Sequence, residues 1–176
     1  MGRALVVFES MFGNTEAVAR AVGDGLAERM PVDVVPVSAA PDALPADVEL
    51  LVVGGPTHAF GLSRASTRRS AVDQGAQPRG GVAVGLREWL AALALAGVAH
   101  RAVTFDTRVR VRGLPGSAAR AVTRRLRSLG FDVDEHRTFW VQGTPGPLAD
   151  GELDRARAWG VDLAVSRPGR APTGVG

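Results

Sequence analysis

The residues best suited to chemistry lie in one six-residue stretch, Ser10–Thr15, which reads SMFGNT and contains Asn14, the single asparagine of the chain. Its hydroxyl and amide groups can donate hydrogen bonds to phosphate oxygens, and Gly13 lets the backbone turn sharply because it has no Cβ atom. The stretch follows a strand-like run and precedes a helical pattern, and a helix N-terminus offers unpaired N–H groups and a partial positive charge. We therefore predict a phosphate site at this corner, with an ordinary helix cap on Ser10 or Thr15 as the alternative.

The kind of ligand is limited by what the sequence lacks. Without any lysine, the corner cannot be a P-loop of the GxxxxGK[ST] kind, and the absence of a GxGxxG run argues against a dinucleotide. The chain has no cysteine, which excludes disulfides and thiol chemistry, and its three histidines are too far apart in sequence for a metal-ligand spacing. No metal is predicted.

The elements that must position this corner alternate between strand-like and helical patterns. Strands are predicted at residues 4–8, 32–37, 48–55, 101–106 and 131–141, and helices at 16–30, at 87–97, after a Ser117 cap and after an Asp150 cap. Apolar residues on both faces of the strands favour a doubly wound α/β domain, with a five-stranded parallel sheet and helices on both faces. We assign residues 1–166 to this one domain and 167–176 to a flexible tail.

In such sheets, ligands bind beyond the carboxyl ends of the strands. Three loops are therefore candidates for one site: Glu9–Thr15, Gly55–Arg69 and Asp106–Gly116. The second loop, GGPTHAFGLSR, can offer backbone amides and flat side chains to a ring system. A planar cofactor with a phosphate group would suit all three.

The run SMFGNTE after the first strand resembles the phosphate-binding loop of flavodoxins, whose usual form is T-x-[ST]-G-N-T. It is most similar to the loop in the flavodoxin domain of flavodiiron proteins. The resemblance extends over nearly the whole chain, through the five strands and the SLGFDV run that leads into the last of them. It implies a flavodoxin-like fold with strand order 2-1-3-4-5 and FMN as the cofactor.

The resemblance also implies which residues hold FMN. They are Ser10, Met11, Phe12, Gly13, Asn14 and Thr15 for the phosphate, Pro56, Thr57, His58, Phe60 and Gly61 for one side of the flavin ring, and Asp106, Thr107 and Arg108 for the other side. Two features depart from the family pattern. Phe12 stands where a hydroxyl is usual, and the chain has no tyrosine and no tryptophan in either ring loop, so the usual stacking partners are missing.

Charge is unevenly distributed along the chain. Residues 55–130 hold thirteen arginines against three acidic residues, whereas residues 1–54 hold three against eight. Flavodoxin-type carriers are typically acidic around the flavin, so these basic loops favour negative charge on the flavin and a partner with an acidic docking face. The loop arginines expected to meet anions are Arg64, Arg68, Arg69, Arg108, Arg110 and Arg112.

We expect an FMN-binding protein that acts in electron transfer. The alternatives are an FMN-dependent oxidoreductase that passes electrons from NAD(P)H to a quinone or another small acceptor, and a flavodoxin-fold interaction module without flavin, so enzymatic activity stays open. The expected partner is a redox protein or a small acceptor molecule, and a homodimer is compatible with the sequence. No motif indicates nucleic-acid binding, no apolar run approaches about 18 residues, and no leader pattern is present, so a cytoplasmic location without membrane contact is expected.

Overall fold

The structure is a computed structural model that describes residues 2–57, 61–94, 100–110 and 116–166. Strands and helices alternate along the chain, as the sequence predicts. The elements are β1 (Arg3–Phe8), α1 (Asn14–Leu26), β2 (Val32–Pro36), a 3-10 turn η1 (Val37–Ala39), β3 (Val48–Pro56), α2 (Ala65–Asp73), α3 (Leu86–Ala92), β4 (Arg101–Val109), α4 (Ala118–Ser128), β5 (Asp132–Val141) and α5 (Glu152–Val165).

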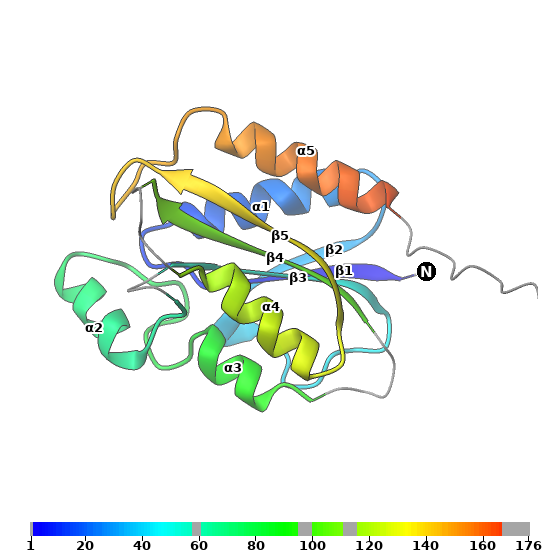
Figure 1. Ribbon diagram of the computed structural model, residues 1–176, viewed down its shortest axis with the longest axis horizontal. Coiled ribbons are helices and arrows are strands. Elements are labelled where there is room, and N and C mark those ends of the chain that lie inside the picture. Colours follow the sequence, from blue (N-terminus) through cyan, green and yellow to red (C-terminus); the bar gives the residue numbers. More distant parts are fainter. Residues whose placement is uncertain (1, 58–60, 95–99, 111–115, 167–176) are drawn as a thin grey trace, which may run out of the picture.

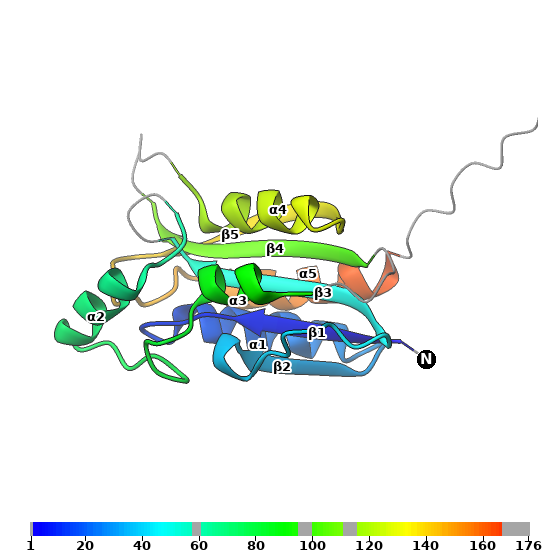
Figure 2. The ribbon, with the colours of Figure 1, turned by 90° about the horizontal axis from the view of Figure 1, so that it is seen from below.

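The five strands form one parallel sheet in the order β2-β1-β3-β4-β5. This confirms the predicted flavodoxin-like α/β architecture. Helices α1 and α5 cover one face of the sheet, and α3 and α4 cover the other (Figures 1 and 2). Helix α2 lies at the end of the sheet toward which the strand arrows point, where the candidate loops also lie.

The core consists of two apolar layers, one on each face of the sheet. On β1, Val6 and Phe8 pack toward α1 and α5, while Leu5 and Val7 pack toward α3 and α4. Every residue of β1 from Ala4 to Phe8 is buried. A strand that is covered on both faces needs apolar side chains at successive positions, and this accounts for the continuous LVVF run.

Two glycines bring α1 and α5 into backbone contact. A Cβ atom on Gly25 would lie 2.1 Å from the carbonyl oxygen of Arg157, and one on Gly160 would lie 2.2 Å from that of Val22. A side chain at either position would force the helices apart, because the neighbouring atoms belong to the backbone. The packing of these helices therefore depends on glycine at the point of contact.

Some details differ from the sequence prediction. Helix α2 begins within the loop predicted at Gly55–Arg69, α3 ends at Ala92, and Gly151 rather than Asp150 is the N-cap of α5. Ser117 caps α4 as predicted, accepting a hydrogen bond from the Arg120 N–H at 3.2 Å. The predicted tail, 167–176, lies outside the described residues. None of the described helices is long and apolar enough to cross a membrane.

Helix α2 is attached to the domain by buried polar groups. The fully buried Arg68 guanidinium donates a hydrogen bond to the Ser63 hydroxyl at 2.9 Å and pairs with Glu88 at 3.1 Å. The Ser63 hydroxyl in turn donates to Glu9, a buried carboxylate at the end of β1. The sequence analysis predicts that Arg68 contacts an anion, but in the structure its guanidinium group pairs with Glu88 inside the protein.

Candidate functional site

The predicted phosphate loop turns into α1 through Gly13, the N-cap residue, which has φ 89°. The Ser10 hydroxyl oxygen accepts hydrogen bonds from the N–H groups of Gly13 and Glu16, at 3.1 and 3.2 Å. Ser10 therefore fixes the loop from within and keeps its own proton for another acceptor. A Cβ atom at Gly13 would meet nothing within 4 Å, so space does not require glycine here. The positive φ does, because other residues rarely adopt this left-handed backbone conformation.

Several backbone donors of this loop are unused. The N–H groups of Phe12, Asn14 and Thr15 donate to no acceptor within the described part of the chain. They lie at the start of a 13-residue helix, where the helix dipole favours negative charge. Unpaired N–H groups beside the Ser10 hydroxyl form a donor set that fits a phosphate group.

The loops after β1, β3 and β4 meet in one pocket, as predicted. Its lining residues are Ser10, Met11, Phe12, Asn14, Thr15, Pro56, Thr57, Thr107, Arg108, Val109, Val141 and Thr144. Nine of these are among the residues implied by the flavodoxin resemblance. The Thr15 and Thr107 hydroxyl oxygens lie 2.7 Å apart and link the first loop to the third.

The other implied residues lie elsewhere. Gly61 lines a different pocket, described below, and Gly13 supports the loop without lining this one. His58 and Phe60 lie outside the described residues. Contact of any of these residues with FMN stays a prediction.

Asp106 lies beneath the pocket and holds its loops in place. Its carboxylate is fully buried. One oxygen accepts hydrogen bonds from the Thr57 hydroxyl, the Ser117 hydroxyl and the Ala119 N–H, at 2.9, 2.6 and 3.2 Å, and the other accepts from the Thr138 hydroxyl at 2.7 Å. These groups come from the ends of β3 and β5 and the start of α4. Asp106 therefore positions the site rather than lining it.

A fourth loop, after β5, also contributes to the pocket. Val141 and Thr144 line it, and the Asn14 side-chain amide donates to the carbonyl oxygen of Pro145 at 3.2 Å. The asparagine amide was expected to face the phosphate, but in this structure it joins the first loop to the fourth. The signal for this loop was available, because the carboxyl end of a strand next to β4 must reach the same edge of the sheet.

An aromatic side chain stands beside the third loop although the loop sequence contains none. Trp140 on β5 is the register partner of Arg108 on β4. The guanidinium carbons of Arg108 and Arg110 lie 5.8 and 5.0 Å from the centre of the Trp140 ring, a distance at which cation and ring attract. Trp140 thus holds two arginines at the edge of the pocket.

One carboxylate in the first turn of α1 is neutralised by arginines. Burial raises the pKa of Glu16, but hydrogen bonds from Arg20 and Arg79 outweigh burial and leave the pKa below its ordinary value. The contacts are 2.8 Å to Arg20 and 3.0 Å to Arg79. The N-terminal end of α1 therefore keeps its attraction for an anion despite an acidic residue in the turn.

Comparison with known proteins agrees with this geometry. The family model described as Flavodoxin matches residues 6–85. An archaeal flavodoxin structure is 18% identical with a TM-score of 0.61, covering 93% of this chain and 96% of its own. Oxidised Flavodoxin 1 from Bacillus cereus is 15% identical with a TM-score of 0.66, covering 95% and 100%. A diflavin flavoprotein A3 from Nostoc sp. is 18% identical with a TM-score of 0.51, covering 93% and 92%. No curated protein matches the sequence.

These matches cover the phosphate loop, the first three strands and, in the solved structures, nearly the whole domain. Residues 6–85 are therefore similar in sequence to flavodoxins, which bind FMN, and the described domain has the flavodoxin-like fold.

Proposed function

We propose that this protein binds FMN in the pocket formed by the four loops and transfers single electrons or pairs of electrons between redox partners. The carrying observation is the donor set at the start of α1, where the unused N–H groups of Phe12, Asn14 and Thr15 and the Ser10 hydroxyl belong to residues that line one pocket. When bound, FMN supplies the redox chemistry. The chain binds its phosphate, orients its ring between the loops and limits its contact with water.

The lining of the pocket favours a carrier over an enzyme. Among its described residues are hydroxyls, an amide, an arginine and apolar side chains, and none is an acid or base that titrates near neutral pH. An oxidoreductase that reduces a quinone must usually deliver protons to it from a positioned group. Electron transfer alone needs only a bound flavin with an accessible edge.

Comparison of FMN with riboflavin tests the phosphate seat. Riboflavin lacks the phosphate, so flavin fluorescence titration of the unloaded protein should show FMN binding at least about a hundredfold tighter, given charge-assisted hydrogen bonds of roughly 1.5 to 3 kcal/mol each. Mass spectrometry of the cofactor from purified protein should show FMN and not FAD. Equal affinities for FMN and riboflavin would place the phosphate outside this loop.

The partner is proposed to carry an acidic docking face, because Arg108 and Arg110 lie at the edge of the pocket. Two small electron acceptors of opposite charge test whether the surface around the flavin is positive. Oxidation of the reduced protein by ferricyanide should slow as salt rises, while oxidation by hexaammineruthenium(III) should accelerate. The opposite pair of salt effects would show that an acidic surface surrounds the flavin. Sustained oxidation of NADPH with a quinone would instead support the oxidoreductase alternative.

A further inference from the structure

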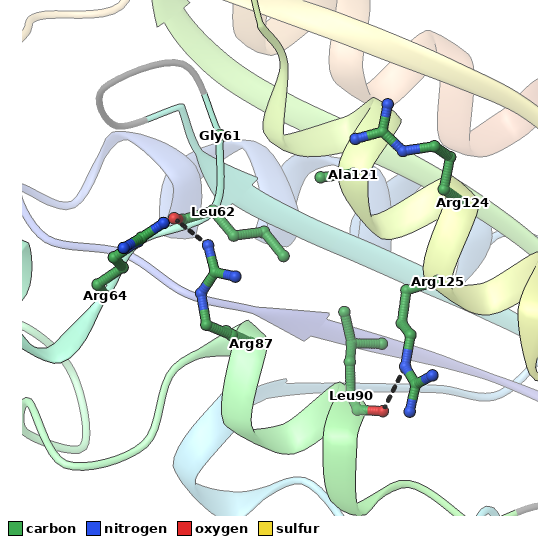
Figure 3. Close-up of a pocket in the computed structure, with 8 residues that line it drawn as sticks. All are labelled: Gly61, Leu62, Arg64, Arg87, Leu90, Ala121, Arg124 and Arg125. Atoms are coloured by element: carbon green, nitrogen blue, oxygen red, sulfur yellow. Dashed lines mark hydrogen bonds between the residues drawn. The ribbon is translucent and has the colours of Figure 1, made fainter.

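A second pocket lies on the α3 and α4 side of the sheet and shares no lining residue with the first. Four arginines line it, and they come from three separate elements (Figure 3). Arg64 precedes α2, Arg87 lies on α3, and Arg124 and Arg125 lie on α4. All four arginines are exposed, so water and salt reduce their mutual repulsion, and an anion bound between them would reduce it further.

No acidic side chain compensates these arginines within the described structure. Arg87 donates to the carbonyl oxygens of Leu62 and Ser63 at 3.0 and 3.2 Å, which are neutral acceptors. The guanidinium groups of Arg64 and Arg124 donate to no acceptor in the part of the chain that the structure describes.

Arg125 also uses a neutral acceptor, donating to the carbonyl oxygen of Leu90 at 3.2 Å (Figure 3). Elsewhere in the described chain, eight other arginines form ion pairs. The four arginines of this pocket take part in none of those pairs. Their positive charge is therefore available to an external anion.

The floor of the pocket limits the kind of anion. Leu62, Leu90 and Ala121 lie between the arginines, so part of any ligand would rest on an apolar surface (Figure 3). The arginines surround a hollow rather than a flat area, which suits a compact ligand better than the face of a protein. A guanidinium group binds phosphate oxygens in pairs, and four of them match the charge of two phosphoryl groups.

We propose that this pocket binds a small ligand carrying two or more phosphoryl groups. The proposal does not depend on FMN binding, because the two pockets have separate linings. Inorganic diphosphate and a nucleoside diphosphate share the chemistry that the arginines recognise. They differ in that only the nucleoside diphosphate has a base, which could pack on the apolar floor of the pocket.

Isothermal titration of the protein loaded with FMN tests the proposal, because the phosphate loop is then filled. Pyrophosphate and ADP are the probes, and the flavin absorbance reports separately whether the first pocket is occupied. Both probes should bind, more weakly at high salt. Tighter binding of ADP would identify a nucleotide as the source of the phosphoryl groups, and equal binding would identify the inorganic ion. If the purified protein does not retain FMN, the same titration is done in a saturating concentration of FMN, so that the phosphate loop stays filled.

Arg124→Gln is the informative variant, because Arg124 makes no described contact whose loss would destabilise the fold. It should weaken ADP binding about tenfold and leave the melting temperature unchanged. Arg120→Gln is the matched control, since Arg120 is exposed on the same helix but outside the pocket. The proposal is overturned if neither probe binds, if both variants bind ADP as the wild type does, or if an acidic glutamate peptide binds more tightly than both phosphates.

Discussion

Replacement of Asp106 should reveal how much of the site depends on one buried carboxylate. Asp106→Ala removes the acceptor of four hydrogen bonds, from Thr57, Ser117, Ala119 and Thr138. Each orphaned donor costs about 1 to 3 kcal/mol, and the three hydroxyls can rotate toward other acceptors, so we take the lower end for each, roughly 4 kcal/mol in all. For a domain of this size that corresponds to a fall in melting temperature of about 8–16 °C.

A second substitution at Asp106 separates the effect of the carboxylate charge from that of the side-chain volume. Asp106→Asn keeps one acceptor oxygen and the volume of the side chain, so it should cost only about 1–2 kcal/mol. Asp132→Ala is the control, because Asp132 is an exposed aspartate at the start of β5. Urea unfolding followed by circular dichroism gives the free energy of unfolding for each variant. If Asp106→Ala unfolds within 1 kcal/mol of Asp132→Ala, the hydrogen bonds do not hold the loops as described.

Three further predictions concern the phosphate loop and α2. Gly13→Ala should lower the free energy of unfolding by about 1 kcal/mol, because Gly13 has a positive φ, and should weaken FMN binding. Gly151→Ala, at the left-handed N-cap of α5, should lower stability by a similar amount and leave FMN affinity unchanged. An equal loss of FMN affinity in both variants would contradict the role of the loop. Because the pKa of Glu16 is lowered, its stabilising contacts exist above pH 4.5 and disappear as pH falls through the folded-state pKa. The free energy of urea unfolding should therefore fall more steeply with acidification for the wild type than for Glu16→Gln. The same pH dependence in both proteins would contradict this role of Glu16. Arg68→Met should destabilise the protein by about 3 kcal/mol in thermal unfolding, because Arg68 is fully buried, while the exposed control Arg69→Met should change little. Similar values for both variants would show that the contacts of Arg68 with Ser63 and Glu88 are unimportant.

The sheet could be predicted from the sequence because its strands are apolar on both faces and separated by clear helical patterns. Helix α2 could not, since its buried residues are Arg68 and Ala71 rather than an apolar stripe. Periodicity detects helices that pack through hydrophobic side chains, and α2 packs through a buried charge. The pattern of helix capping was also misleading at Asp150, because the adjacent Gly151 takes the cap position instead.

The parts of the candidate site marked by a motif or by a strand end could be predicted from the sequence. The other parts could not. The contributions of Val141 and Thr144 follow from strand order, which no local pattern reveals. The position of Trp140 could not be predicted, because it lies in a strand and only the pairing of β4 with β5 places it beside Arg108. The role of Asp106 required knowledge of which donors surround it in three dimensions.

The attachment of α2 has a consequence for how the protein opens locally. We expect a helix held by Arg68, Ser63 and Glu9 rather than by the main hydrophobic layers to separate from the sheet without unfolding it. Its amides should then exchange with solvent as a unit, faster than those of the buried strands. Glu9 immediately precedes Ser10, so each such opening hydrates a carboxylate at the start of the phosphate loop. A ligand that orders this loop would therefore slow amide exchange in α2, and docking of α2 would in turn strengthen binding of that ligand.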